Sequence, residues 1–158
     1  MVVIDQHALH ERVMFQQLME RINEGPLQSQ RLLVPAVIEI KGDATARVAS
    51  LEKLFNRIGI EADVMGPETV AVHAFPTLLF ERRVDPVAFM SELLDRSGED
   101  DAAQSSEAAL HEVVDMMACK SAIKAGDVLS EKEMVGLIAS LEETERSTRC
   151  PHGRPTLL

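Results

Sequence analysis

Apolar residues change their spacing along the chain, and this change constrains the fold more than any other feature of the sequence. Residues 44–58 place apolar side chains on one face of a helix, and Gly59 follows where a helix would end. Residues 60–65 and 69–75 are two short apolar runs separated by a turn sequence, which is typical of paired strands. A helix followed directly by two strands predicts a mixed fold.

The rest of the chain continues this alternation. Asp5 is expected to cap a helix, and Ser130 with Glu133 is expected to form a capping box at the start of another. A strand is expected over residues 31–40 with a break at Pro35, and helices over residues 6–23, 86–95, 106–125 and 131–143. Alternating strands and helices predict the α/β or α+β class.

Length and composition narrow the class of protein. The 158 residues suit one domain, or one domain with an inserted lobe, and 46% hydrophobic residues indicate a globular chain rather than a disordered one. No apolar run approaches the ~18 residues of a membrane span, and no signal peptide is visible, so no membrane partner is expected. Both ends are apolar, and we interpret the chain as a piece of a longer protein.

The charge of the chain bears on nucleic-acid binding. The formal net charge is −10, which argues against binding by bulk electrostatics. Residues 92–115 hold eight acidic side chains and one arginine, whereas residues 146–158 hold three arginines and no acid. Residues 96–105 are polar and are the best linker candidate. We therefore expect this chain alone to bind double-stranded DNA weakly.

Three clusters of side chains could bind a metal. His7 and Glu11 are four residues apart, so a helix would place both on one face beside Asp5, although such pairs are also common on helices without a metal. Cys150 and His152 point the same way in extended backbone, and the prolines and glycine around them favour a rigid site, although a plain rigid turn would explain them too.

Cys119 lies within an expected helix and by itself suggests a small buried hydrophobe. We do not expect a disulfide between Cys119 and Cys150, because we interpret the chain as cytosolic. Together the clusters offer more ligands than one tetrahedral zinc needs, and two metals that share ligands are typical of phosphodiester hydrolysis. The six candidates are Asp5, His7, Glu11, Cys119, Cys150 and His152.

The strings DQHALHE (residues 5–11), ACKSAIKAGD (118–127) and CPHGRP (150–155) resemble, in order, the motifs of the C-terminal domain of the MutL family of DNA mismatch-repair proteins, in its endonuclease-active branch. The resemblance implies a metal-dependent nicking endonuclease that forms a homodimer. It implies a dimerisation and endonuclease subdomain (residues 1–28 and 105–158) with an inserted regulatory subdomain (29–104).

The resemblance also implies roles for individual residues. Asp5 would be the catalytic acid residue, and zinc would be a regulatory ion, whereas manganese or magnesium would support nicking. Arg154, with Lys120 and Arg149, could contact the scissile phosphate because of its charge. The family implies a cytoplasmic, nucleoid-associated protein that meets the mismatch-recognition protein MutS through its full length. The metal ligands would be His7, Glu11, Cys119, Cys150 and His152.

A further string in the expected inserted subdomain resembles the motif by which this family docks on the replication sliding clamp. A glutamine amide offers directed hydrogen bonds, and the aliphatic side chains suit a hydrophobic pocket. A plain strand with a polar start is the alternative interpretation. The residues concerned are Gln30, Leu32, Leu33, Val34 and Pro35.

Gln16 and His10 lie in or near the first motif but are not among the expected metal ligands. The family usually has a glutamate where this chain has Gln16, and that position points well away from the face of His7 and Glu11, so we expect reduced rather than abolished metal use. His10 lies one helical turn from His7, but the family motif leaves that position open. We therefore interpret His10 as a surface or rim residue.

Two other classes of function stay open on the sequence. The first is a non-catalytic module in which zinc stabilises a dimer that docks on the clamp. The second is a thiol enzyme that uses Cys150 with His152, but no orienting group or oxyanion feature accompanies that pair. Retention of all three motifs favours the endonuclease.

Overall fold

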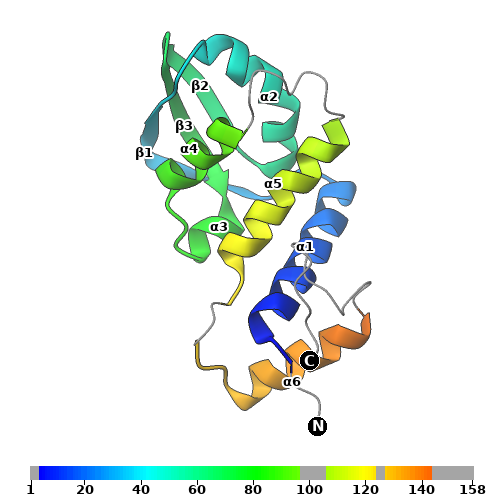
Figure 1. Ribbon diagram of the computed structural model, residues 1–158. Coiled ribbons are helices and arrows are strands. Elements are labelled where there is room, and N and C mark those ends of the chain that lie inside the picture. The colour runs from blue at the N-terminus through cyan, green and yellow to red at the C-terminus, as the bar shows by residue number, and fades with distance from the viewer. Residues whose placement is uncertain (1–3, 97–105, 124–126, 144–158) are drawn as a thin grey trace. The chain divides into compact units, whose positions relative to one another are not determined.

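The computed structural model describes residues 4–96, 106–123 and 127–143. Over these residues the chain forms six helices and one three-stranded antiparallel sheet (Figure 1), which confirms the mixed class expected from the sequence. The helices are α1 (Gln6–Glu24), α2 (Ala44–Ile58), α3 (Thr77–Glu81), α4 (Pro86–Arg96), α5 (Ser106–Ser121) and α6 (Glu131–Glu143), and the strands are β1 (Ser29–Glu39), β2 (Glu61–Gly66) and β3 (Thr69–Pro76).

The chain divides into two compact units. One unit contains Met1–Glu20 and Val114–Leu158, and the other contains Arg21–Val113. We call them the split unit and the continuous unit, since the second interrupts the first in sequence. The predicted boundaries after residues 28 and 104, and the regulatory role of the segment between them, stay predictions.

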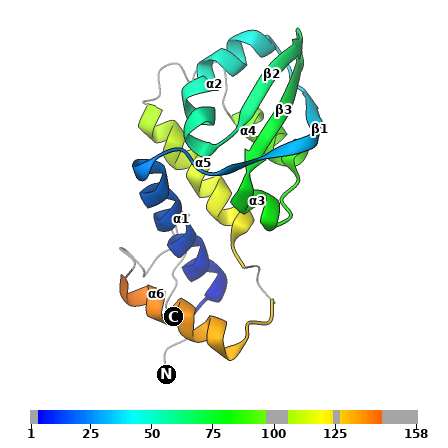
Figure 2. The same ribbon diagram turned by 180° about the vertical axis from the view of Figure 1, so that it is seen from behind.

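The continuous unit is built on the sheet, whose strand order is β1-β3-β2. The central strand β3 is the most buried, and Val70, Val72 and Phe75 have no exposed surface. Helix α2 packs along β2 and α4 along β1, and both lie on the same side of the sheet (Figure 2). The Arg47 guanidinium donates to the Leu94 carbonyl at 2.8 Å, which ties these two helices together.

Helix α2 spans the residues that its sequence predicts and ends at Gly59 as expected, and the structure adds an N-cap at Asp43. The Asp43 carboxylate accepts from the Thr45 amide at 2.9 Å and from the next amide along the helix. Gly59 ends the helix with φ of 76°, a left-handed conformation that favours glycine. A Cβ atom at this position would lie 2.6 Å from the Leu27 carbonyl oxygen, so the close approach of the chain also requires glycine.

Strand β1 lies at an edge of the sheet and is interrupted where Pro35 predicts a break. Arg31 pairs with Ala74 and Ala36 with Val72, so β1 advances five residues while β3 advances two. The segment Leu32–Pro35 therefore leaves the ladder between two paired stretches. Proline has no amide hydrogen to donate to a ladder, which explains why the bulge forms here.

The split unit has a small apolar cluster between two helices. Leu9 and Val13 of α1 and Leu137 of α6 are buried together, and Ile4 and Leu129 pack against them. The long helix α5 ends at Ser121, earlier than the predicted end at residue 125, so that prediction was wrong. None of the described helices is long and apolar enough to cross a membrane.

Helix α6 begins with the capping box that its sequence predicts. The Ser130 hydroxyl donates to Glu133 Oε2 at 2.6 Å, the Ser130 amide donates to the same oxygen at 2.8 Å, and the Glu133 amide donates back to Ser130 Oγ. The hydrogen bond from the Ser130 side chain, and then that from its amide, lower the pKa of Glu133 below its ordinary value of 4.5.

The capping box predicts a pH-dependent effect of Ser130→Ala. At pH 7 the substitution should lower the free energy of unfolding by about 1 kcal/mol, because the cap is lost. The pKa of Glu133 is lower in the folded chain than in the unfolded chain, so its contribution is present above the unfolded pKa and disappears as the pH falls through the folded pKa. Urea unfolding at pH 7 and at successively lower pH should show the difference shrink.

The matched control is Ser50→Ala, because the Ser50 hydroxyl donates only to the Arg47 carbonyl within α2 and caps no helix. Its effect should be small and should not change with pH. An effect of Ser130→Ala that stays constant down to acid pH would contradict the role assigned to the Glu133 carboxylate.

Candidate metal centre

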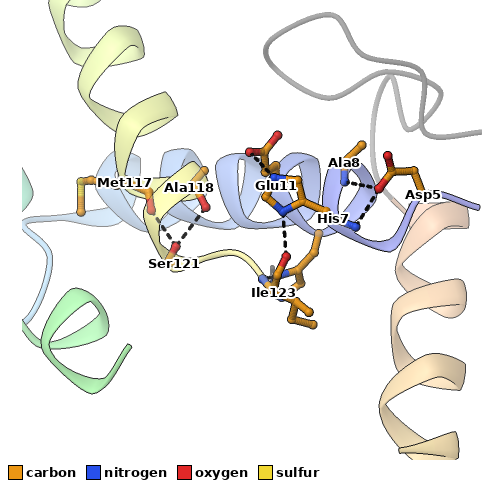
Figure 3. Close-up of polar contacts among 9 residues, drawn as sticks. Asp5, His7, Ala8, Glu11, Met117, Ala118, Ser121 and Ile123 are labelled. Carbon is orange, nitrogen blue, oxygen red and sulfur yellow. Dashed lines mark hydrogen bonds and ion pairs between the residues drawn. The ribbon is translucent and has the colours of Figure 1, made fainter. Parts of the chain in front are cut away.

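Asp5 stands at the start of α1 and caps it. Its Oδ1 accepts from the His7 amide at 3.0 Å and from the Ala8 amide at 3.1 Å (Figure 3), which confirms the predicted N-cap. These bonds hold the exposed carboxylate in one orientation at the mouth of the helix. Oδ2 takes no part in the cap, and it is the oxygen with which Asp5 would bind a cation.

His7 and Glu11 lie one turn apart on α1 and face each other. His7 Nε2 is 3.2 Å from Glu11 Oε1, and the two side chains are 19% and 3% exposed. The other ring nitrogen, Nδ1, is 2.7 Å from the Ile123 carbonyl oxygen (Figure 3). A carbonyl oxygen can only accept a hydrogen bond, so Nδ1 carries a hydrogen.

The position of that hydrogen decides what the pair can bind. With Nδ1 protonated, a neutral His7 presents a bare lone pair at Nε2 to a buried carboxylate oxygen. Two such atoms at 3.2 Å need either a proton on Nε2, which makes an ordinary ion pair, or a cation that both atoms bind.

The residues present fit a divalent metal. A metal-binding histidine usually donates its second ring hydrogen to a carbonyl or carboxylate, as His7 does to Ile123. Two ligand atoms at ~2.0–2.1 Å from one zinc in tetrahedral geometry are about 3.3–3.4 Å apart, close to the separation of His7 Nε2 and Glu11 Oε1. The spacing of these two atoms therefore fits a shared cation, and their role as metal ligands stays a prediction.

Cys119 is an exposed residue on α5, whereas its neighbour Ala118 is fully buried. The interpretation of Cys119 as a small buried hydrophobe was therefore wrong. The role of Cys119 as a metal ligand stays a prediction.

The described residues alone do not complete the predicted ligand set. Over residues 4–96, 106–123 and 127–143, no three His, Cys, Asp or Glu side chains converge on a point where they could hold a metal. Cys150, His152 and the third motif, with Arg149 and Arg154, lie outside the described residues. The joint site of the three motifs stays a prediction.

The part of the chain that contains the first two motifs matches the sequence model of a known protein family. A sequence model described as the MutL C terminal dimerisation domain matches residues 1–129. The chain belongs to the MutL C-terminal domain family. The match includes the first motif and all of the second, and it confirms the family that the three strings indicate.

Full-length relatives are similar to this MutL-family chain from end to end. It is 32% identical, over its whole length, to the DNA mismatch repair protein MutL of Bartonella bacilliformis, and 33% identical to the proteins of that name from Brucella abortus and a Chelativorans species. These alignments cover 26%, 25% and 25% of the three relatives. The chain thus spans about a quarter of the length of the relatives it matches.

Gln16 and His10 each make a hydrogen bond that the family motif does not indicate. Gln16, where the family usually has glutamate, donates from its side chain to Glu20 Oε1 at 3.0 Å, further along α1. His10 is partly buried, and its Nδ1 accepts from the Ile123 amide at 2.9 Å, a main-chain partner that the interpretation of His10 as a surface or rim residue did not include. Helical spacing alone showed that His10 lies near His7, but only the tertiary structure supplies Ile123.

The segment that resembles a clamp-docking motif in this MutL-family chain coincides with the bulge of β1. Leu33 is 104% exposed and Val34 is 78% exposed, and Leu32 is partly buried beside them. Gln30 is still paired with Phe75 in the ladder, just before the bulge begins. Apolar side chains that a sheet edge presents to solvent in this way are suited to a hydrophobic pocket on another molecule.

Proposed function

We propose that this chain is the endonuclease and dimerisation domain of a MutL mismatch-repair protein and that it nicks double-stranded DNA. The observation that carries the proposal is the state of His7, whose Nδ1 hydrogen is held by the Ile123 carbonyl while Nε2 faces the buried Glu11 carboxylate. This arrangement prepares a histidine and a glutamate to act as ligands. The match to the family supports the assignment.

The proposed metal ligands are His7, Glu11, Cys119, Cys150 and His152. Zinc would occupy a regulatory position that thiolate and imidazole ligands favour, and manganese or magnesium would support nicking. A bound divalent cation would polarise a DNA phosphate and lower the pKa of the attacking water. Lys120 and Arg154 would hold the phosphate by charge.

Asp5 has a separate part in this proposal. The amides of His7 and Ala8 fix one oxygen of its carboxylate, so the other is held in a defined direction at the start of α1. A carboxylate oriented by its own helix loses little conformational freedom when it binds a cation. Asp5 would therefore orient the cation that acts on the scissile phosphate.

The substitution Asp5→Asn tests this role with little change in stability. Asparagine caps a helix about as well as aspartate, so α1 should keep its cap while the site loses a negative charge. Nicking of supercoiled plasmid with manganese should fall by about a hundredfold or more. Gel quantification of the nicked circle against time is the measurement.

The matched control is Asp43→Asn, which makes the same change at the N-cap of α2 in the continuous unit. It should leave nicking unchanged. If Asp5→Asn nicked plasmid as fast as wild type, Asp5 would have no catalytic part. If the wild type did not nick at all, even with the clamp present, the endonuclease proposal would fail.

A second activity, docking on the replication sliding clamp, rests on the bulge of β1. Leu33 and Val34 are held in solvent by a strand that is paired on both sides of them, so binding would order little additional chain. Leu32 and Pro35 complete the apolar surface, and the Gln30 amide would add directed hydrogen bonds. The clamp is thus proposed as a partner of the continuous unit.

The substitution Leu33→Ala should weaken binding to the purified clamp by about tenfold or more, because a leucine side chain would no longer be buried at the interface. The fold should be unaffected, since the Leu33 side chain is fully exposed among the residues that the structure describes. Surface plasmon resonance with immobilised clamp measures the change. Val37→Ala, an exposed aliphatic position on the same strand outside the bulge, is the matched control. Equal losses for the two variants would exclude the bulge as the docking site.

The rival function is a non-catalytic module that dimerises, holds zinc for stability and docks on the clamp. The His7–Glu11 pair would serve a structural zinc as well as a catalytic metal. One result distinguishes the two functions. Tight zinc binding and clamp binding without any nicking would favour the non-catalytic module.

The remaining partners follow from the family. A homodimer is expected from the description of the matching domain, and sedimentation equilibrium should give twice the monomer mass of 17.4 kDa. A mass of one chain at micromolar concentration would contradict the homodimer. Contact with the mismatch-recognition protein MutS, and a cytoplasmic location at the nucleoid, would be properties of the longer protein.

A further inference from the structure

Two histidines of α1 contact the main chain of one residue that lies far away in the sequence. His7 Nδ1 is 2.7 Å from the carbonyl oxygen of Ile123, and His10 Nδ1 is 2.9 Å from the amide nitrogen of the same residue. His7 and His10 are one helical turn apart, so both rings reach the same short segment. All three residues belong to the split unit.

The chemistry of the Ile123 main chain assigns opposite tautomers to the two rings. The carbonyl oxygen only accepts, so Nδ1 of His7 is protonated, whereas the amide only donates, so Nδ1 of His10 is bare. A neutral His10 therefore carries its hydrogen on Nε2, whereas His7 carries a hydrogen on Nδ1 whether or not Nε2 also holds the proton that it would share with Glu11. The main chain of Ile123 therefore gives the Nδ1 atoms of His7 and His10 opposite hydrogen-bonding roles.

His10 also takes an amide that would otherwise continue helix α5. The Ala122 amide still donates to the Ala118 carbonyl at 2.9 Å, in the helical pattern. The next amide, that of Ile123, donates to His10 instead of to the carbonyl four residues earlier. This competing bond explains why α5 ends before its predicted end at residue 125.

The two hydrogen bonds act on adjacent peptide planes that meet at the Cα atom of Ile123. Each plane is rigid, so a plane held by His10 leaves the Ile123 carbonyl only rotations about the two bonds at that Cα. The His10 bond thereby reduces the positions open to the carbonyl that accepts from His7. A fixed Nδ1 hydrogen in turn keeps Nε2 of His7 directed at Glu11, 3.2 Å away.

We infer that His10 is a positioning residue for His7 and acts through the main chain of Ile123. His10 holds the Ile123 amide, the Ile123 carbonyl holds the Nδ1 hydrogen of His7, and Nε2 of His7 is presented as a metal ligand. The last step rests on the proposed metal-dependent function, but the first two concern this chain alone and can be measured without metal.

Three substitutions separate the hydrogen bond from the shape of the ring. His10→Phe keeps a ring of similar size but offers no acceptor to the Ile123 amide. His10→Asn keeps an acceptor near the position of Nδ1 and should restore much of the effect. His111→Phe, at an exposed histidine on α5, controls for the loss of an imidazole elsewhere.

The first readout is the tautomer of His7 in metal-free protein, from two-dimensional NMR that correlates the imidazole nitrogens and carbons, at a pH at which the rings are neutral. Wild type, His10→Asn and His111→Phe should show His7 with its hydrogen on Nδ1 and a protected Ile123 amide in hydrogen exchange. His10→Phe should show a mixture of tautomers and an exchange rate at least about tenfold faster. An unchanged His7 tautomer in folded His10→Phe would overturn the inference.

The second readout is the affinity for zinc and manganese by titration calorimetry. His10→Phe should bind about tenfold more weakly than wild type, and His10→Asn should recover most of the loss. If wild type bound no metal, the proposed function would fail while the NMR result still decided the positioning role. If wild type bound metal and His10→Phe bound it equally well, the inference would be overturned and the proposed function would stand.

Discussion

The main chain of Ile123 is the constraint on which the rest of the split unit depends. It accepts a hydrogen bond from one histidine of α1 and donates one to another, across 116 and 113 residues of sequence. Gln6 adds a third bond from α1 to this part of the chain, donating to the Asp127 carbonyl at 3.0 Å. The start of the first family motif is thus attached to the second motif by main-chain contacts, which do not depend on the side chains of the second motif.

This attachment connects local structure with chemistry. The Asp5 cap fixes the beginning of α1, the turn of helix that follows presents His7 and Glu11 on one face, and Ile123 selects the tautomer of His7. Each step uses a short-range interaction. Together they place a carboxylate oxygen and an imidazole nitrogen side by side before any cation arrives, so the proposed metal would replace the proton that the pair shares.

Much of the fold was predictable because its signals are local. The caps at Asp5 and Ser130, the glycine that ends α2 and the break of β1 at Pro35 all rest on interactions within a few residues. The short helix α3 was missed, because it follows a strand that runs directly into it, without a side-chain cap. The end of α5 was misplaced, because a histidine more than a hundred residues away takes the Ile123 amide.

The candidate site was predictable in its residues but not in its connections. The spacing of His7 and Glu11 indicated a shared helical face, and the family motifs indicated which side chains bind metal. No local pattern could show that His10 and His7 share Ile123, or that Cys119 is exposed while Ala118 is buried. Charge adds a further constraint, since at −10 the proposed nicking depends on the clamp or on other parts of a longer protein to bring DNA.

We propose that His7 and Glu11 of the first motif bind a metal ion together, rather than forming only an ion pair with each other. Anomalous diffraction from crystals grown with zinc, and separately with manganese, measures it most directly. We expect an anomalous peak from a metal ion that lies ~2.0–2.3 Å from His7 Nε2 and that the Glu11 carboxylate also binds. Crystals saturated with either metal that showed no peak at these two side chains, with His7 Nε2 bonded directly to Glu11, would contradict it.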